Sequence, residues 1–117
     1  YDFFRAKIGD IPHEECHLLL LNTKNQLMEH HVIGRGGISE STVDIRLALR
    51  HALMASAPNL IIAHNHPSGN PNPSRQDDNL TMRLHKACET MSLRLLDHIV
   101  IGDDTYYSYS DEGRING

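Results

Sequence analysis

Two histidines and one aspartate have the types and the spacing of ligands for a metal ion. The stretch LIIAHNHPSGNPNPSRQD, residues 60–77, carries His64 and His66 at the end of an apolar run. If that run is a strand, both imidazoles project from one face, because side chains two residues apart on a strand do so. A catalytic zinc ion uses three protein ligands and keeps a fourth position for water. Asp77 would complete this set if the intervening loop returns it to the histidines.

The loop before Asp77 is rich in proline, glycine and asparagine, which favours a stiff and tight excursion. Asp77 then falls in the first turn of the next expected helix. Ser74 and Asp77 also fit a capping box, with Ser74 as the N-cap and Asp77 at the third helical position. A His-x-His pair alone is a weak signal, and a helix cap needs no metal. Their combination favours a metal site, and Ser74 is a candidate for both a cap and a catalytic group.

The elements that must position these residues alternate along the chain. Apolar residues at helical spacing predict helices over Val43–Ala57, with Ser41, Thr42 or Asp44 as its cap, and over Ser74–Met91. Short apolar runs bounded by turn residues predict strands. These strands cover Cys16–Leu21, Gln26–Ile33, Leu60–His64, Leu93–Ile101 and Thr105–Ser110, with hairpins at NTKN and GDD. The order β-β-α-β-α-β-β predicts an α/β sandwich with a mixed sheet covered by helices.

Composition and length limit the class of protein. The 117 residues fit a single domain, residues 1–117, and the net charge of −4 argues against a non-specific nucleic-acid binder. No apolar run approaches the roughly 20 residues that span a bilayer, so we expect no membrane partner. Cys16 and Cys88 stand singly, which predicts buried thiols in a reducing, cytoplasmic compartment. The start lacks both a Met and a signal peptide, so we expect a domain excised from a longer protein.

The metal motif resembles a known family. HNHPSGNPNPSRQD matches the JAMM (MPN+) metalloprotease pattern: His-x-His-Pro, six residues, Ser-x-x-Asp. The form AHNHPSGNPNPS, LDHIVIG downstream and LLLNTKNQLMEHHVIGRGGIS upstream resemble the RadC-type branch, and the likeness covers about residues 14–113. The resemblance implies a cytidine-deaminase-like, three-layer α/β/α sandwich with a mixed sheet. It also implies one zinc ion bound by His64, His66 and Asp77.

The resemblance further implies hydrolysis of peptide or isopeptide bonds in a protein or peptide substrate. In JAMM enzymes a glutamate from a preceding strand acts as the general base, and the motif serine helps to hold the oxyanion. This places Ser74 at the oxyanion and the base at the start of the first hairpin strand, where Glu14 is our choice. Strand alternation turns Glu15 to the opposite face, and Glu29 and Glu40 are more distant alternatives. RadC-type proteins carry a DNA-repair label, which the resemblance neither supports nor removes.

Other motifs suggest different chemistry. HEECH, residues 13–17, satisfies the His-Glu-x-x-His expression of zinc peptidases, but that motif requires a helix. On the expected strand its two histidines would lie about 13 Å apart, too far to share an ion. Zinc deaminases share the expected fold, but the Cys-x-x-Cys pair that they use is missing from this sequence.

Three further features have two interpretations each. A histidine on a buried strand, such as His98, is usually a hydrogen-bonded core residue, and the alternative is a role behind the metal ligands. Asp78 competes with Asp77 as a ligand, although the motif spacing selects Asp77. Gly36 and Gly37 resemble a phosphate loop only faintly, and we expect them to let the backbone run close to a substrate.

Two functions therefore follow from the sequence. The first is a zinc-dependent hydrolase of peptide or isopeptide bonds. The second is a non-catalytic, metal-binding interaction module in a DNA-repair or mobile-element system. The complete set of His64, His66 and Asp77 favours the enzyme, because a scaffold does not need an open coordination position.

Overall fold

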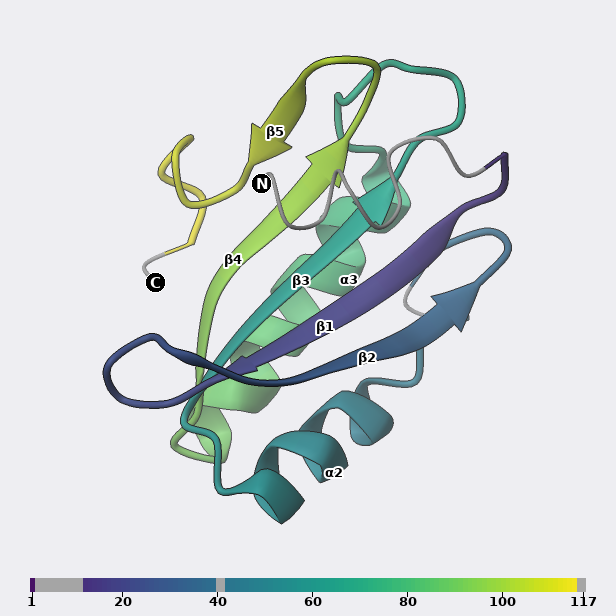
Figure 1. Ribbon diagram of the computed structural model, residues 1–117. Coiled ribbons are helices and arrows are strands. Elements are labelled where there is room, and N and C mark those ends of the chain that lie inside the picture. The colour runs from purple at the N-terminus through teal and green to yellow at the C-terminus, as the bar shows by residue number, and fades with distance from the viewer. Residues whose placement is uncertain (2–11, 40–41, 116–117) are drawn as a thin grey trace.

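The computed structural model describes residues 1, 12–39 and 42–115. Five strands and two helices follow one another in the expected order (Figure 1). The strands are β1 (Glu15–Leu21), β2 (Leu27–Arg35), β3 (Asn59–Asn65), β4 (Arg94–Ile101) and β5 (Tyr106–Ser108), and the helices are α2 (Ile45–Ala55) and α3 (Arg75–Thr90). The predicted elements are thus confirmed, with bounds that differ by a few residues.

The sheet has the order β2-β1-β3-β4-β5. Strands β3 and β4 are parallel, and every other neighbouring pair is antiparallel, so the predicted mixed sheet is confirmed. In the β1–β3 pairing Cys16 lies opposite His64. Because these strands run in opposite directions, the start of β1 and the end of β3 meet at the same edge of the sheet.

Both helices cover the same face of the sheet. Leu18 and Leu20 of β1 pack in one core with Ala48 and Ala52 of α2 and with Leu84 of α3. Figure 1 shows α3 crossing behind the sheet and α2 below β2. The opposite face carries a smaller apolar cluster formed by Leu19, Ala63, Ile99 and Ile101. The described residues thus provide the sheet and one helical layer of the expected sandwich.

Helix α2 is shorter than its predicted range. Among the three candidate caps, Asp44 is the N-cap, and its carboxylate accepts the backbone N–H of Arg46. Ser41 lies outside the described residues, and the backbone N–H of Ser39 donates to the Thr42 side chain in the preceding turn. The helix ends at Ser56, which has a left-handed backbone with φ of 54°. The predicted continuation to Ala57 is wrong because this conformation reverses the chain.

The proline-rich loop is fastened to the turn between β4 and β5. The backbone N–H of His66 donates to the carbonyl of Ile101, and that of Asp103 donates to the carbonyl of Gly69. A side chain at Gly102 would place its Cβ 2.3 Å from the carbonyl oxygen of Gly69. Two glycines thus allow the loop and the turn to touch, which fixes the return path of the chain toward α3.

Neither of the helices in the described part combines the length and the apolar composition needed to cross a bilayer.

The two cysteines should be chemically inert in the folded protein. Both are free and buried, and burial raises the pKa of the Cys16 thiol to about 12 and that of Cys88 to about 11. At about pH 8, neither thiol should react with Ellman's reagent, because thiolates are the reactive species. After unfolding in guanidinium chloride, both should react. Rapid modification of either thiol in the folded chain would contradict the buried placement.

Candidate metal centre

The predicted ligands meet at the edge of the sheet where β3 ends. His64 is the next-to-last residue of β3, His66 directly follows this strand, and Asp77 lies in the first turn of α3. The Nε2 atoms of the two histidines are 3.1 Å apart. His64 Nε2 lies 3.0 Å from Asp77 Oδ1, and His66 Nε2 lies 3.0 Å from Asp77 Oδ2. The structure therefore brings all three side chains to one point.

These separations fit a single zinc ion. With zinc–ligand bonds of about 2.0–2.1 Å, neighbouring corners of a tetrahedron lie about 3.3 Å apart. The three measured distances are close to this value, with the two histidines facing different oxygens of the Asp77 carboxylate. Two imidazoles with one carboxylate are ligands that zinc accepts. His64 and Asp77 are almost fully buried, whereas His66 is partly exposed. Among the three predicted ligands, His66 is therefore the one that faces solvent.

The hydrogen bonds behind His64 fix which of its nitrogens is free. Thr81 donates its hydroxyl proton to the carbonyl of Asp77 at 2.8 Å. Its oxygen must therefore accept from Nδ1–H of His98, which lies 2.5 Å away. His98 Nε2 is then an acceptor, and it receives the proton of His64 Nδ1 at 2.8 Å. In its neutral form His64 consequently carries its proton on Nδ1, which leaves the Nε2 lone pair for a metal ion.

Burial supports this arrangement electrostatically. His98 is fully buried, and desolvation together with the nearby His64 holds its pKa well below the ordinary value. A neutral His98 can accept one proton and donate another, as the network needs. The Tyr109 ring stacks on the His98 ring, with their centroids 5.0 Å apart and an angle of 10° between the ring planes. His98 is thus a hydrogen-bonded core residue, as the first interpretation expects, and one of its partners is the predicted ligand His64, so its role behind the metal ligands stays a prediction.

His66 is oriented in the same way by a different partner. Its Nδ1 donates to the carbonyl of Asn70 at 2.8 Å, because a carbonyl can only accept. Nε2 therefore faces the carboxylate. The hydrogen bond to Asp77 raises the pKa of His66, and burial opposes this rise. Burial would raise the pKa of Asp77, but hydrogen bonds from His64 and His66 lower it far below the usual range. The aspartate is thus ionised at neutral pH.

Asp77 also starts the helix. Its backbone N–H donates to Ser74 Oγ at 3.1 Å, and its Oδ2 accepts the N–H of Ser74 at 2.8 Å. The predicted capping box is confirmed. Its neighbour Asp78 points elsewhere, because its carboxylate accepts the Tyr109 hydroxyl at 2.7 Å and pairs with Arg114 at 3.0 Å.

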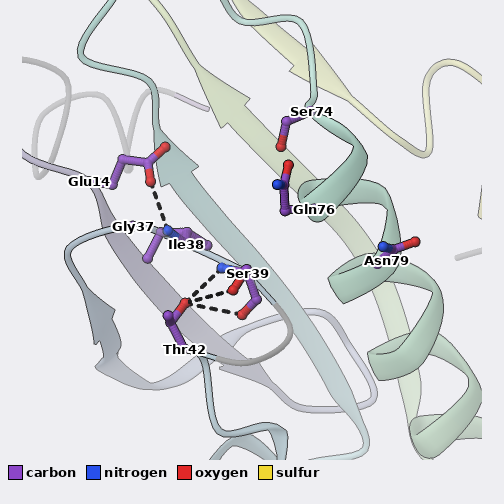
Figure 2. A pocket seen from close by; sticks show the side chains of 8 residues that line it. All are labelled: Glu14, Gly37, Ile38, Ser39, Thr42, Ser74, Gln76 and Asn79. Carbon is purple, nitrogen blue, oxygen red and sulfur yellow. Dashed lines mark hydrogen bonds between the residues drawn. The ribbon is translucent and has the colours of Figure 1, made fainter.

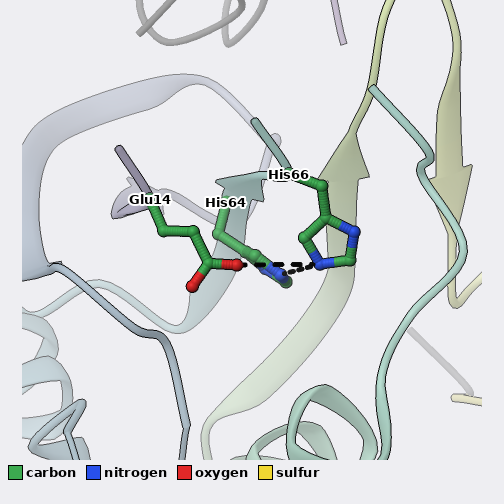
Figure 3. Close-up of side chains that lie close together, drawn as sticks. All are labelled: Glu14, His64 and His66. Carbon is green, nitrogen blue, oxygen red and sulfur yellow. Dashed lines mark hydrogen bonds and ion pairs between the residues drawn. The ribbon is translucent and has the colours of Figure 1, made fainter. Parts of the chain in front are cut away.

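Glu14 faces the two histidines from the start of β1 (Figure 3). One oxygen of Glu14 and one nitrogen from each of His64 and His66 lie within 4.8 Å of one another, and Glu14 Oε1 is 4.0 Å from His66 Nε2. The second oxygen, Oε2, accepts the backbone N–H of Ile38 at 2.8 Å, which holds the carboxylate in place. Glu14 is partly exposed, in contrast to Asp77.

The neighbouring glutamate points away from these histidines, as strand alternation predicts. Glu15 instead forms ion pairs with His13 at 3.1 Å and with His17 at 2.9 Å. His17 lies within strand β1, so the His-Glu-x-x-His helix that HEECH would require is absent from this part of the described chain. Glu29 lies near the other end of β2, and Glu40 is outside the described residues.

Asn65 positions Glu14 and was not singled out in the sequence. Its side chain accepts the backbone N–H of Glu15 at 2.8 Å and donates to the carbonyl of His13 at 2.9 Å. The two bonds hold the backbone on either side of Glu14. The available signal was a polar residue placed between two histidines within an apolar strand, because such a buried amide needs partners.

A cleft of about 570 Å³ opens beside Glu14 (Figure 2). Its wall includes Ser74, whose oxygen accepts from Asp77 and whose hydroxyl proton remains available to donate. Gly37 also lines the cleft, whereas Gly36 is outside this lining, and the approach of either glycine to a substrate stays a prediction. The other lining residues are mostly polar: Ile38, Ser39, Thr42, Gln76 and Asn79.

Comparison with known proteins identifies the family. The model described as a RadC-like JAB domain matches residues 1–114, and the chain belongs to this family. It is 46% identical over 107 residues to a UPF0758 protein of Porphyromonas gingivalis, covering 91% of this chain and 47% of that protein. A UPF0758 protein of Carboxydothermus hydrogenoformans is 42% identical over 112 residues, and this match covers 96% of this chain and 50% of that protein. The chain therefore spans about half the length of these relatives, and the resemblance to the RadC-type branch is confirmed.

Replacing His98 with phenylalanine should weaken zinc binding. The phenyl ring keeps the stacking on Tyr109 but cannot accept the proton of His64 Nδ1. Loss of such a partner typically costs about 10–100-fold in metal affinity. Competition titration with a zinc chelator would measure the change, and thermal unfolding would verify the fold. Unchanged affinity in a folded variant would show that the hydrogen bond does not orient His64.

Zinc binding should weaken as the pH falls. The hydrogen bond from His66 to Asp77 raises the pKa of His66, so a proton on Nε2 is more firmly held and must leave before a metal binds. Below the raised pKa, affinity should drop by about tenfold per pH unit for one displaced proton. Calorimetry in buffers with different ionisation enthalpies would count the released protons. Affinity independent of pH from about 6 to 8 would contradict this linkage.

Proposed function

We propose that the chain is a zinc-dependent hydrolase that cleaves peptide or isopeptide bonds. The observation that carries this proposal is the convergence of His64, His66 and Asp77 beside a partly exposed Glu14. Membership of the RadC-like JAB family supports it. A bound zinc ion would polarise the scissile carbonyl and lower the pKa of water from 15.7 to about 7.

The two acidic side chains suit different roles. Asp77 lies 3.0 Å from both Nε2 atoms, is 1% exposed and has an ionised carboxylate, which suits a ligand. Glu14 lies further away, at 4.0 Å from His66, and is 25% exposed. A general base must exchange protons with water and substrate, so it needs this access. We therefore assign Asp77 with the two histidines to the metal and Glu14 to proton transfer.

The reaction then follows from the positions of the side chains. Glu14 Oε1 accepts a proton from the attacking water while the hydrogen bond from Ile38 steadies Oε2. The same carboxyl group then delivers the proton to the leaving nitrogen, as general base and acid in turn. Ser74 can donate its hydroxyl proton to the oxygen that gains negative charge. Gln76 and Asn79 line the cleft and can bind the amides of an extended protein or peptide substrate.

Two variants separate catalysis from metal binding. Glu14→Gln should keep zinc and lower kcat/KM by about 10²–10⁴-fold, because it removes only the proton acceptor. Asp77→Asn should lose the zinc ion held with His64 and His66, and activity with it. Glu15→Gln is the matched control on the same strand, and it should retain both. Zinc content by elemental analysis and cleavage of peptide libraries and ubiquitin-like conjugates would provide the measurements.

The outcomes distinguish the enzyme from the interaction module. Cleavage that depends on both Glu14 and Asp77 would support the hydrolase. Stoichiometric zinc without cleavage above the Glu14→Gln background would favour a non-catalytic metal-binding module. Lack of zinc in the unmodified chain at saturating metal would refute both.

A further inference from the structure

A second group of potential metal ligands lies between the outer strand β2 and helix α2. Glu29 and His31 come from β2, and His51 comes from α2. One potential ligand atom from each of them lies within 4.8 Å of the others. His31 pairs with Leu18 on β1, which pairs with Ile62 on β3, so the group is two strands away from the strand that carries His64.

The three side chains already contact one another: Glu29 pairs with His31, and the His31 ring stacks on the His51 ring. His31 Nε2 lies 2.7 Å from Glu29 Oε1. The rings of His31 and His51 stack face to face, with centroids 3.7 Å apart and an angle of 15°. Two imidazolium rings would repel each other at this distance, so at least one ring is neutral. Burial and the nearby His31 lower the pKa of His51, in agreement with a neutral ring there.

We propose that Glu29, His31 and His51 form a second binding site for a divalent transition-metal ion. The ion would take the place of the proton between Glu29 and His31, and His51 would add the third ligand. Two imidazoles and a carboxylate suit zinc, and water can complete the coordination. The lone pair of each imidazole lies in its ring plane, so binding one ion would require the His31 and His51 rings to turn out of their face-to-face stack until their nitrogens converge at the spacing of about 3.3 Å that zinc requires.

This ion would link two elements that are far apart in sequence. Helix α2 would be tied to the edge strand beside it, in addition to its apolar contacts with the sheet. The single carboxylate offsets part of the ionic charge, while Arg50 opposes it near His51. The role is therefore structural: the ion stabilises the position of α2, and it acts independently of the proposed hydrolysis.

Zinc stoichiometry tests the second site directly. The unmodified chain should bind two zinc ions, and His51→Phe should bind one, because phenylalanine keeps the ring stack but removes a ligand. Asp77→Asn should also bind one ion, and the double variant none. His85→Phe is the matched control, since His85 also faces a carboxylate, Glu89, at 3.4 Å but lies outside the group. It should bind two.

A milder variant and a second readout keep the test decisive. Glu29→Gln alters an exposed side chain and should weaken the second ion by at least about tenfold, as loss of one charged ligand does. Zinc should raise the Tm of Asp77→Asn but not that of the double variant. A single ion per unmodified chain that His51→Phe retains, or a second ion with Kd above about 100 µM that His51→Phe leaves unchanged, would overturn the proposal. Loss of the Asp77 ion alone would leave it intact.

Discussion

The structure depends on the burial of one carboxylate, that of Asp77. A buried charge is costly unless hydrogen bonds and opposite charges surround it. The N-terminus of α3 provides a backbone donor from Ser74, and the sheet edge provides His64 and His66. The same carboxylate thus closes the first turn of a helix and holds two imidazoles in place. The loop between His66 and α3 must therefore follow a defined path, which the close contact of Gly69 with Gly102 helps to fix.

Much of this arrangement could be predicted because it is encoded locally. The spacing of His64 and His66 on a strand, and the first-turn position of Asp77, are properties of residues close in sequence. The element order and the mixed sheet followed from apolar periodicity and turn residues in the same way. The choice of Glu14 came from resemblance together with strand alternation. The structure places its carboxylate beside the histidines, while its role as base remains a prediction.

The remaining features depend on contacts between distant segments, and local patterns do not carry that information. The hydrogen bonds from His98 to Thr81 and from His64 to His98 join a helix to two parallel strands. The sequence could mark His98 as a buried polar residue, but its partner follows only from the register of β3 and β4. The two hydrogen bonds between the Asn65 side chain and the backbone around Glu14 likewise depend on the antiparallel pairing of β1 with β3. The predicted end of α2 at Ala57 was wrong because Ser56 adopts a left-handed backbone. This conformation is uncommon for residues other than glycine, so the sequence did not indicate it.

The stacking of Tyr109 on His98 gives the segment after β5 an influence on the interior. Arg114 packs over the outer face of the same tyrosine ring, and both side chains contact Asp78. A displacement of residues 109–114 would therefore change the support behind His98 and, through it, the direction of the His64 lone pair. A neighbouring domain or partner that binds residues 109–114 could therefore change the orientation of His64 without contacting the cleft.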